Sequence, residues 1–93
     1  MDWQAMTDKA ILTALGERAA RQRLNQNVTQ NELVKRAGVT RIVVQRLEDG
    51  RGCTLESLLR VLRALGLLNQ LDLFLPEPGP SPIQLAKLKG KER

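Results

Sequence analysis

The four residues Ala37-Gly38-Val39-Thr40 constrain the fold more than any other part of the chain. They separate two short stretches, "TQNELVKR" and "RIVVQRLE", and each of these has the apolar spacing of a helix. A connection of three to four residues with a glycine suits two helices that turn sharply on one another. The sequence therefore predicts a helix-turn-helix arrangement near the middle of the chain.

Threonine caps predict four helices in all. Thr29 and Glu32 fit a capping box at the start of the second helix, and Gly38 fits its C-terminal cap. The other three helices also begin after a threonine: Thr7, Thr40 and Thr54. The first helix is expected over residues 9–24. An apolar stripe marks the fourth: Leu55, Leu58, Leu59, Leu62 and Leu65.

Composition and breaker residues set the limits of the fold. One Trp, one Phe and no Tyr among 93 residues leave the core to aliphatic side chains, which suits packed helices better than sheets. Residues 50–52, "GRG", predict a flexible break, and the prolines of residues 76–82 predict an extended segment. We expect an all-α fold, with a compact four- to five-helix domain over residues 1–75. A Pro-rich basic tail, residues 76–93, would end in either a frayed amphipathic helix or a disordered segment.

Helical geometry gives the third helix two different faces. Five apolar positions of the helix pair are expected to face the interior: Leu33, Ala37, Val39, Val44 and Leu47. Four residues of the third helix fall on the opposite side: Arg41, Ile42, Gln45 and Arg46. Ile42 is therefore expected to point away from the core.

An outward isoleucine among basic and amide side chains has a use on DNA. In a major groove, Ile42 could contact a thymine methyl group while an arginine reaches guanine. The net charge of +5 also favours an acidic partner, nucleic acid first and an anionic membrane second. Taken alone, Arg41 and Arg46 fit ordinary solvated side chains better than a binding face.

The segment "TQNELVKRAGVTRIVVQRLEDGRGCTLESLLRVLRALG" is similar to the Cro and phage-repressor type of helix-turn-helix domain, the XRE family. The resemblance covers residues 15–75 and rests most on "TQNEL", "AGVT", "RLEDG" and "TLESLLRVLRALG". It implies a phage-repressor-like domain in which the third helix recognises DNA. Val34 stands where the family usually has Ala, and Gln22 where it usually has an apolar residue. Both departures affect the expected docking angle of the helices.

The resemblance also implies roles for single residues. It places Arg41, Ile42 and Arg46 nearest the base edges, with Gln45 beside them. Two side chains would contact DNA phosphates, namely the amide of Gln30 and the hydroxyl of Thr40. A buried ion pair would join the first helix to the third: Arg23 and Glu48.

The apolar segment of residues 67–75 is richer in large side chains than a short fifth helix needs. We expect Leu68, Leu71 and Phe74 to form a homodimer interface, although the segment could simply cover the core. The stretch "LESLLRVLRALGLLNQLDLFLPEPGPSP" is similar to the DNA-binding antitoxins that accompany Hip-type kinase toxins. This resemblance implies a kinase-like toxin as a protein partner.

Catalysis is not expected, because the chain has no His and its one Cys, Cys53, has no activating partner. We see no metal-ligand cluster and no glycine-rich phosphate loop, so we expect neither metal nor cofactor. A lone Cys cannot form an internal disulfide, which favours the cytoplasm. No apolar run reaches the length of a membrane span, and "MDWQAMTDK" lacks the features of a signal peptide.

These features predict a transcriptional regulator that binds a palindromic operator in double-stranded DNA as a homodimer. The parts beyond the helical domain favour an autoregulating antitoxin of a toxin–antitoxin operon. Two alternatives stay open: a stand-alone phage-type repressor, and a protein-interaction adaptor that does not read DNA.

Overall fold

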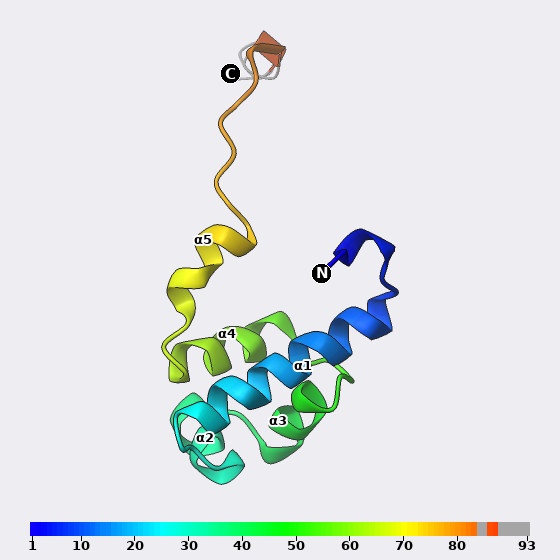
Figure 1. Ribbon diagram of the computed structural model, residues 1–93. Coiled ribbons are helices and arrows are strands. Elements are labelled where there is room, and N and C mark those ends of the chain that lie inside the picture. Colours follow the sequence, from blue (N-terminus) through cyan, green and yellow to red (C-terminus); the bar gives the residue numbers. More distant parts are fainter. Residues whose placement is uncertain (84–85, 88–93) are drawn as a thin grey trace.

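The computed structural model describes residues 1–83 and 86–87 (Figure 1). All regular structure within these residues is helical, which confirms the all-α prediction for them. The α-helices are α1 (Asp8–Asn25), α2 (Gln30–Ala37), α3 (Arg41–Glu48), α4 (Leu55–Ala64) and α5 (Leu71–Phe74). Two 3-10 turns, η1 (Trp3–Ala5) and η2 (Leu68–Gln70), precede α1 and α5. Residues 82–83 and 86–87 are helical as well.

The caps predicted from the sequence are all formed. The Thr29 hydroxyl accepts the Glu32 N–H at 3.1 Å, and the Glu32 carboxylate accepts the Thr29 N–H at 3.0 Å. Gly38 ends α2 in the left-handed region with a φ of 70°, a conformation that glycine adopts without strain. The other three threonines each accept a backbone N–H three residues on: Thr7, Thr40 and Thr54.

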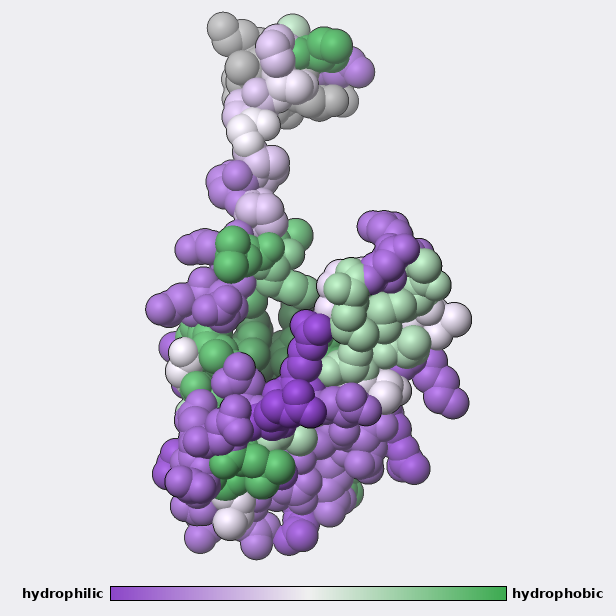
Figure 2. Space-filling model, in the orientation of Figure 1, coloured by the Kyte–Doolittle hydropathy of each residue, from purple (hydrophilic) through white to green (hydrophobic). Residues whose placement is uncertain are grey.

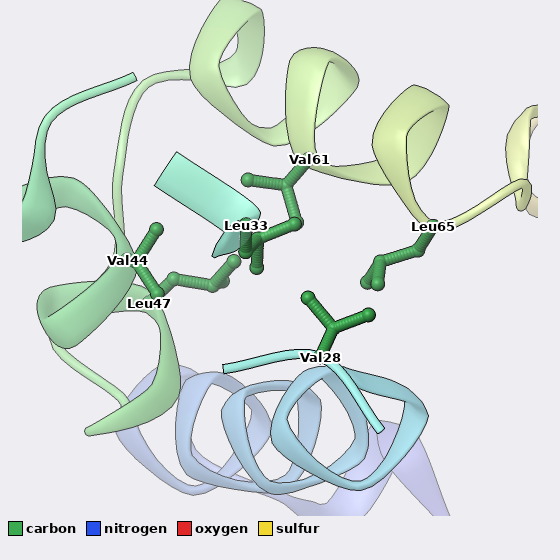
Figure 3. Packing of buried hydrophobic residues seen from close by; sticks show 6 residues of the cluster. All are labelled: Val28, Leu33, Val44, Leu47, Val61 and Leu65. Carbon is green, nitrogen blue, oxygen red and sulfur yellow. The ribbon is translucent and has the colours of Figure 1, made fainter. Parts of the chain in front are cut away.

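The core lies where α1, α2, α3 and α4 meet. Six buried side chains point toward one another there: Val28, Leu33, Val44, Leu47, Val61 and Leu65 (Figure 3). Three of the predicted interior positions are among them, and the other two, Ala37 and Val39, pack against the cluster while partly buried. α3 is thus held by Val44 and Leu47, as its helical spacing predicts.

The stripe predicted for α4 is wrong in part. Val61, which was not in it, is fully buried, whereas Leu55 is 65% exposed. The apolar side chains of α4 form one broad face, with Val61 at its edge, so sequence periodicity does not show which part of that face meets the core. Leu59 and Leu62 are half-buried and line a groove with α1 and α5 instead of the core.

α1 crosses the C-terminal end of α3 at very short range. A Cβ atom on Gly16 would collide with the carbonyl oxygen of Leu47. Gly50 follows α3 and is buried with a φ of 76°, and a Cβ there would lie 2.7 Å from the Thr13 Cα. The predicted flexible break is therefore wrong at Gly50, which is packed against α1.

The short helix α5 follows α4, and the proline segment then leads away from the helical domain (Figure 1). Eight residues of the expected Pro-rich basic tail, 84–85 and 88–93, lie outside the described residues. Among the described helices, none combines the length and apolar character that a membrane span needs.

Candidate nucleic-acid interface

The outward face of α3 combines an exposed apolar side chain with two exposed arginines. Arg41 and Arg46 are exposed, Gln45 is half-buried, and Ile42 is 65% exposed between them. Val44, on the opposite side of the helix, has no exposed surface. The four residues that the sequence places outward therefore do lie outward, on a helix anchored to the core from behind.

Both arginines on this face are tethered at one nitrogen. Nη1 of Arg41 donates to the side-chain oxygen of Asn31 on α2 at 2.9 Å. Nη2 of Arg46 donates to the carbonyl oxygen of Arg51, in the loop after α3, at 3.1 Å. A guanidinium has five N–H donors in a fixed fork, so each arginine keeps donors for an outside acceptor. The tethers reduce the freedom of these side chains without occupying them.

A concave surface enclosing about 440 Å³ lies between the end of α1, the loop that follows it and the first turn of α2, and the first residue of α3, Arg41, also lines it. Its lining residues are Arg23, Leu24, Asn27, Val28, Thr29, Gln30, Asn31 and Arg41. The first turn of a helix has N–H groups without intrahelical partners and carries the positive end of the helix dipole. With Arg41 at its edge, this surface suits an anion such as a phosphate group.

The two residues expected to contact DNA phosphates, Thr40 and Gln30, differ in the hydrogen bonds that they already make within the chain. The Thr40 oxygen accepts the Val43 N–H at 3.3 Å, which leaves its hydroxyl proton able to donate outward. Gln30 is half-buried, and its Nε2 donates to a Glu48 carboxylate oxygen at 3.0 Å. One Gln30 amide N–H is thus directed inward, while the other remains for a ligand. The phosphate role of both residues stays a prediction.

An ion pair links the elements that carry this face. Nε of Arg23 on α1 lies 2.7 Å from one Glu48 oxygen, and Nη2 lies 3.0 Å from the other. The side chains of the pair are only 10% and 7% exposed. The remaining guanidinium nitrogen, Nη1, donates to the Val28 carbonyl oxygen at 2.8 Å. The hydrogen bond to Glu48 raises the pKa of Arg23 above its usual value, against the effect of burial.

This pair fixes the position of α3 and of its outward face. Arg23 comes from the end of α1, Glu48 from the end of α3, and Gln30 from the start of α2. Arg23 and Gln30 both donate hydrogen bonds to the Glu48 carboxylate. This one carboxylate therefore ties α2 and α3 to α1. Within the described residues, every buried side-chain nitrogen and oxygen has a hydrogen-bond partner.

Sequence reasoning missed two contacts at this site. Asn31 positions Arg41, and the capping box that places Asn31 in the first turn of α2 was the available signal. Arg60 on α4 was given no role from the sequence, yet its Nη1 lies 3.4 Å from the Gly38 carbonyl oxygen in the turn. Gln22, the departure on α1, is exposed and needs no internal partner.

Only two of the three residues expected at a dimer interface line the same groove. Leu71 and Phe74 line a groove of about 420 Å³ between α1, α4 and α5, whereas Leu68 is half-buried outside that lining. Figure 2 shows apolar residues in green around the hollow beneath α5.

Residues 1–83 and 86–87 contain no group of three or more His, Cys, Asp or Glu residues placed to hold a metal ion. Burial raises the pKa of the Cys53 thiol, and the nearby charge of Arg46 offsets this only in part. The thiol form, which is a poor nucleophile, is therefore favoured.

No model of a known protein family matches the chain, and no curated protein sequence matches it. The function has to be inferred from the residues and their arrangement.

Proposed function

We propose that the chain is a sequence-specific DNA-binding transcriptional regulator of the XRE type. In it, α2 and α3 form the helix-turn-helix, and α3 enters the major groove. One observation carries this proposal: Ile42 is 65% exposed between Arg41 and Arg46 on a helix that is fixed to the core. An apolar group flanked by two cations fits the thymine methyl groups and guanine acceptors of that groove.

Phosphate contacts would supply much of the affinity and set the register of α3 on the duplex. The concave surface at the first turn of α2 supports this role, because Arg41 and the start of that helix both line it. Thr40 retains a hydroxyl proton and Gln30 one amide N–H for the same purpose. The net charge of +5 adds a general attraction to DNA.

One such domain reads only a few base pairs, which is too little to find one site in a genome. A homodimer would read a palindrome whose half-sites are ~34 Å apart, or a multiple of that distance. Leu68, Leu71 and Phe74 remain the proposed interface, and the partial exposure of these apolar side chains supports it.

We also propose that the chain is an antitoxin. Its protein partner would be a kinase-like toxin, and its DNA target would be the operator of its own operon. The support for this role is the resemblance of the stretch from α4 through the prolines to antitoxins that accompany Hip-type kinase toxins. A stand-alone repressor would share the same DNA-binding surface. Ile42 exposed between two arginines argues against an adaptor that does not read DNA, because this combination suits a DNA major groove.

Selection from duplex DNA with about 20 randomised base pairs tests the proposal. We expect the wild-type chain to enrich a two-fold symmetric sequence, and Ile42→Glu to enrich none. Ile83→Glu is the matched control, because Ile83 is 68% exposed and lies far from α3 in the sequence. If the wild-type chain enriches no sequence at all, the adaptor reading replaces the DNA-binding one.

A further inference from the structure

The groove between α1, α4 and α5 has a mostly apolar lining at the edge of the core. It is lined by Leu15 and Ala19 of α1, Leu59 and Leu62 of α4, and Leu71 of α5, among other residues. The groove is open along one side of the domain, as the green hollow beneath α5 shows (Figure 2). An apolar surface of this kind in a small domain normally marks an interaction site.

Apolar side chains that could fill such a groove are exposed directly beside it. Leu73 is 82% exposed and Leu75 is 80% exposed, and neither lines the groove of its own chain. They sit on α5 and at its C-terminal end, on the segment whose other face, Leu71 and Phe74, forms one side of the groove. The chain thus has an apolar groove and, next to it, two exposed leucines that could fill such a groove in another copy of the chain.

We propose that the groove is occupied by α5 of a second copy of this chain, with Leu73 and Leu75 of each copy inserted between α1 and α4 of the other. The inference rests on the proposed homodimeric function and names the residues of its interface. It adds α1 and α4 to the surface that Leu68, Leu71 and Phe74 suggested.

A two-fold axis makes this exchange self-complementary. When α5 of one copy enters the groove of the other, the symmetry places the second α5 in the first groove, so the contact is made twice. The assembly is then closed and leaves neither groove free for a third copy. A groove matched to an unrelated protein would not require Leu73 and Leu75 to be exposed beside it.

The charges at the groove agree with a second copy as the occupant. Arg18 on α1 lines the groove and is held in place by the Trp3 ring, 4.9 Å from its guanidinium carbon. Asp72 lies between Leu71 and Leu73 on α5. Neither charge forms an ion pair with another residue of the described part of the chain. In the exchanged dimer, Asp72 of each copy can reach Arg18 of the other.

Charge reversal tests this arrangement in the full-length chain. We expect Arg18→Asp alone, or Asp72→Arg alone, to raise the dimer dissociation constant about tenfold or more, because each dimer then carries two like-charge contacts. A mixture of the two variants should dimerise as well as the wild type, because every cross-contact in the mixed dimer joins an acid to a base. Sedimentation equilibrium of each variant and of the mixture gives the three constants. If the mixture dimerises no better than the single variants, the exchange is refuted.

A second pair of variants tests the inserted leucines. Leu73→Glu with Leu75→Glu should give a folded monomer with an unchanged helical circular dichroism spectrum, because both side chains are exposed in the single chain. Ile83→Glu, equally exposed, should remain a dimer. A leucine double variant that stays dimeric contradicts the proposal.

Half-site DNA separates this inference from the proposed function. The leucine double variant retains α3 and should bind a single half-site as the wild-type monomer does. Loss of dimerisation with half-site binding retained supports both ideas. A variant that stays dimeric and still binds DNA refutes only the exchanged interface, whereas a wild-type chain that binds no DNA refutes the proposed function.

Discussion

Arg23 and Glu48 bind each other through two hydrogen bonds, of 2.7 and 3.0 Å, across the junction between α1 and α3. The pair lies 25 positions apart in the sequence and is almost fully shielded from water. It fixes the end of the proposed recognition helix to the longest helix of the domain. Removing one partner would leave the other charged and buried without a counter-charge, so either substitution should destabilise the fold strongly.

Glu48→Ala should lower the free energy of unfolding by about 3–5 kcal/mol, since Arg23 would stay charged and buried without its partner. Such a loss is a large part of the stability of a small domain. Urea unfolding of both proteins measures it. The control is Glu56→Ala, which removes an exposed contact of 3.9 Å to Arg60 and should change stability by less than about 0.5 kcal/mol. A similarly small loss for Glu48→Ala would show that the pair is effectively solvated.

Gly16→Ala should destabilise the protein although alanine is the better helix former. The new Cβ would meet the Leu47 carbonyl oxygen and lie 2.9 Å from that of Glu48, so α1 would have to move away from α3. We expect a loss of about 1–3 kcal/mol, as in other overpacked cores. Gly79→Ala is the control, because a Cβ there meets nothing within 4 Å. If thermal melting gives Gly16→Ala equal or higher stability, the close approach of the two helices is not real.

The capping box predicts how stability responds to acid. Hydrogen bonds from Thr29 lower the pKa of Glu32 below its usual value of 4.5. Because the folded-state pKa is the lower one, the carboxylate stabilises the fold above the unfolded-state pKa and loses this effect as pH falls through the folded-state value. Glu32→Gln keeps a neutral hydrogen bond and should lack this loss. The melting temperature of the wild type should therefore exceed that of Glu32→Gln at about pH 6, and the difference should shrink as the pH falls toward about 2. Parallel curves would contradict the assignment.

Much of the fold was predictable because its signals are local. A threonine cap or a turn glycine acts within three or four residues, so Thr29, Glu32 and Gly38 could be placed from the sequence alone. The two faces of α3 followed from helical spacing, since only one side of that helix is consistently apolar. The outward position of Ile42 was predictable for the same reason.

The remaining features depend on contacts between distant segments. Gly16 and Gly50 matter only because α1 crosses the end of α3, and nothing near either residue in the sequence indicates that crossing. The apolar face of α4 is broad and Val61 lies at its edge, so the burial of Val61 was missed. The tethering of Arg41 by Asn31 needs the relative positions of α2 and α3, which periodicity does not supply.

Leu71→Glu with Phe74→Glu should give a folded monomer with much weaker binding to a palindromic site. Both side chains line the groove between α1, α4 and α5, and a charge there opposes burial by a second copy. Sedimentation and a DNA titration on the same sample measure both effects, with Ile83→Glu as the control. The dimer account fails if the wild type is monomeric at about 50 μM and still binds one palindromic site tightly.

The central claim is that the outward face of α3 reads bases, and Arg46→Ala tests it most directly. Selection on randomised DNA, followed by titration of the selected site, compares this variant with the wild type and with Arg63→Ala, an exposed arginine on α4. We predict that Arg46→Ala weakens binding to the selected site by about 1–3 kcal/mol and relaxes the preference at one base pair in each half-site, while Arg63→Ala keeps the wild-type preference. An Arg46→Ala chain that selects the wild-type sequence with unchanged affinity would contradict the claim.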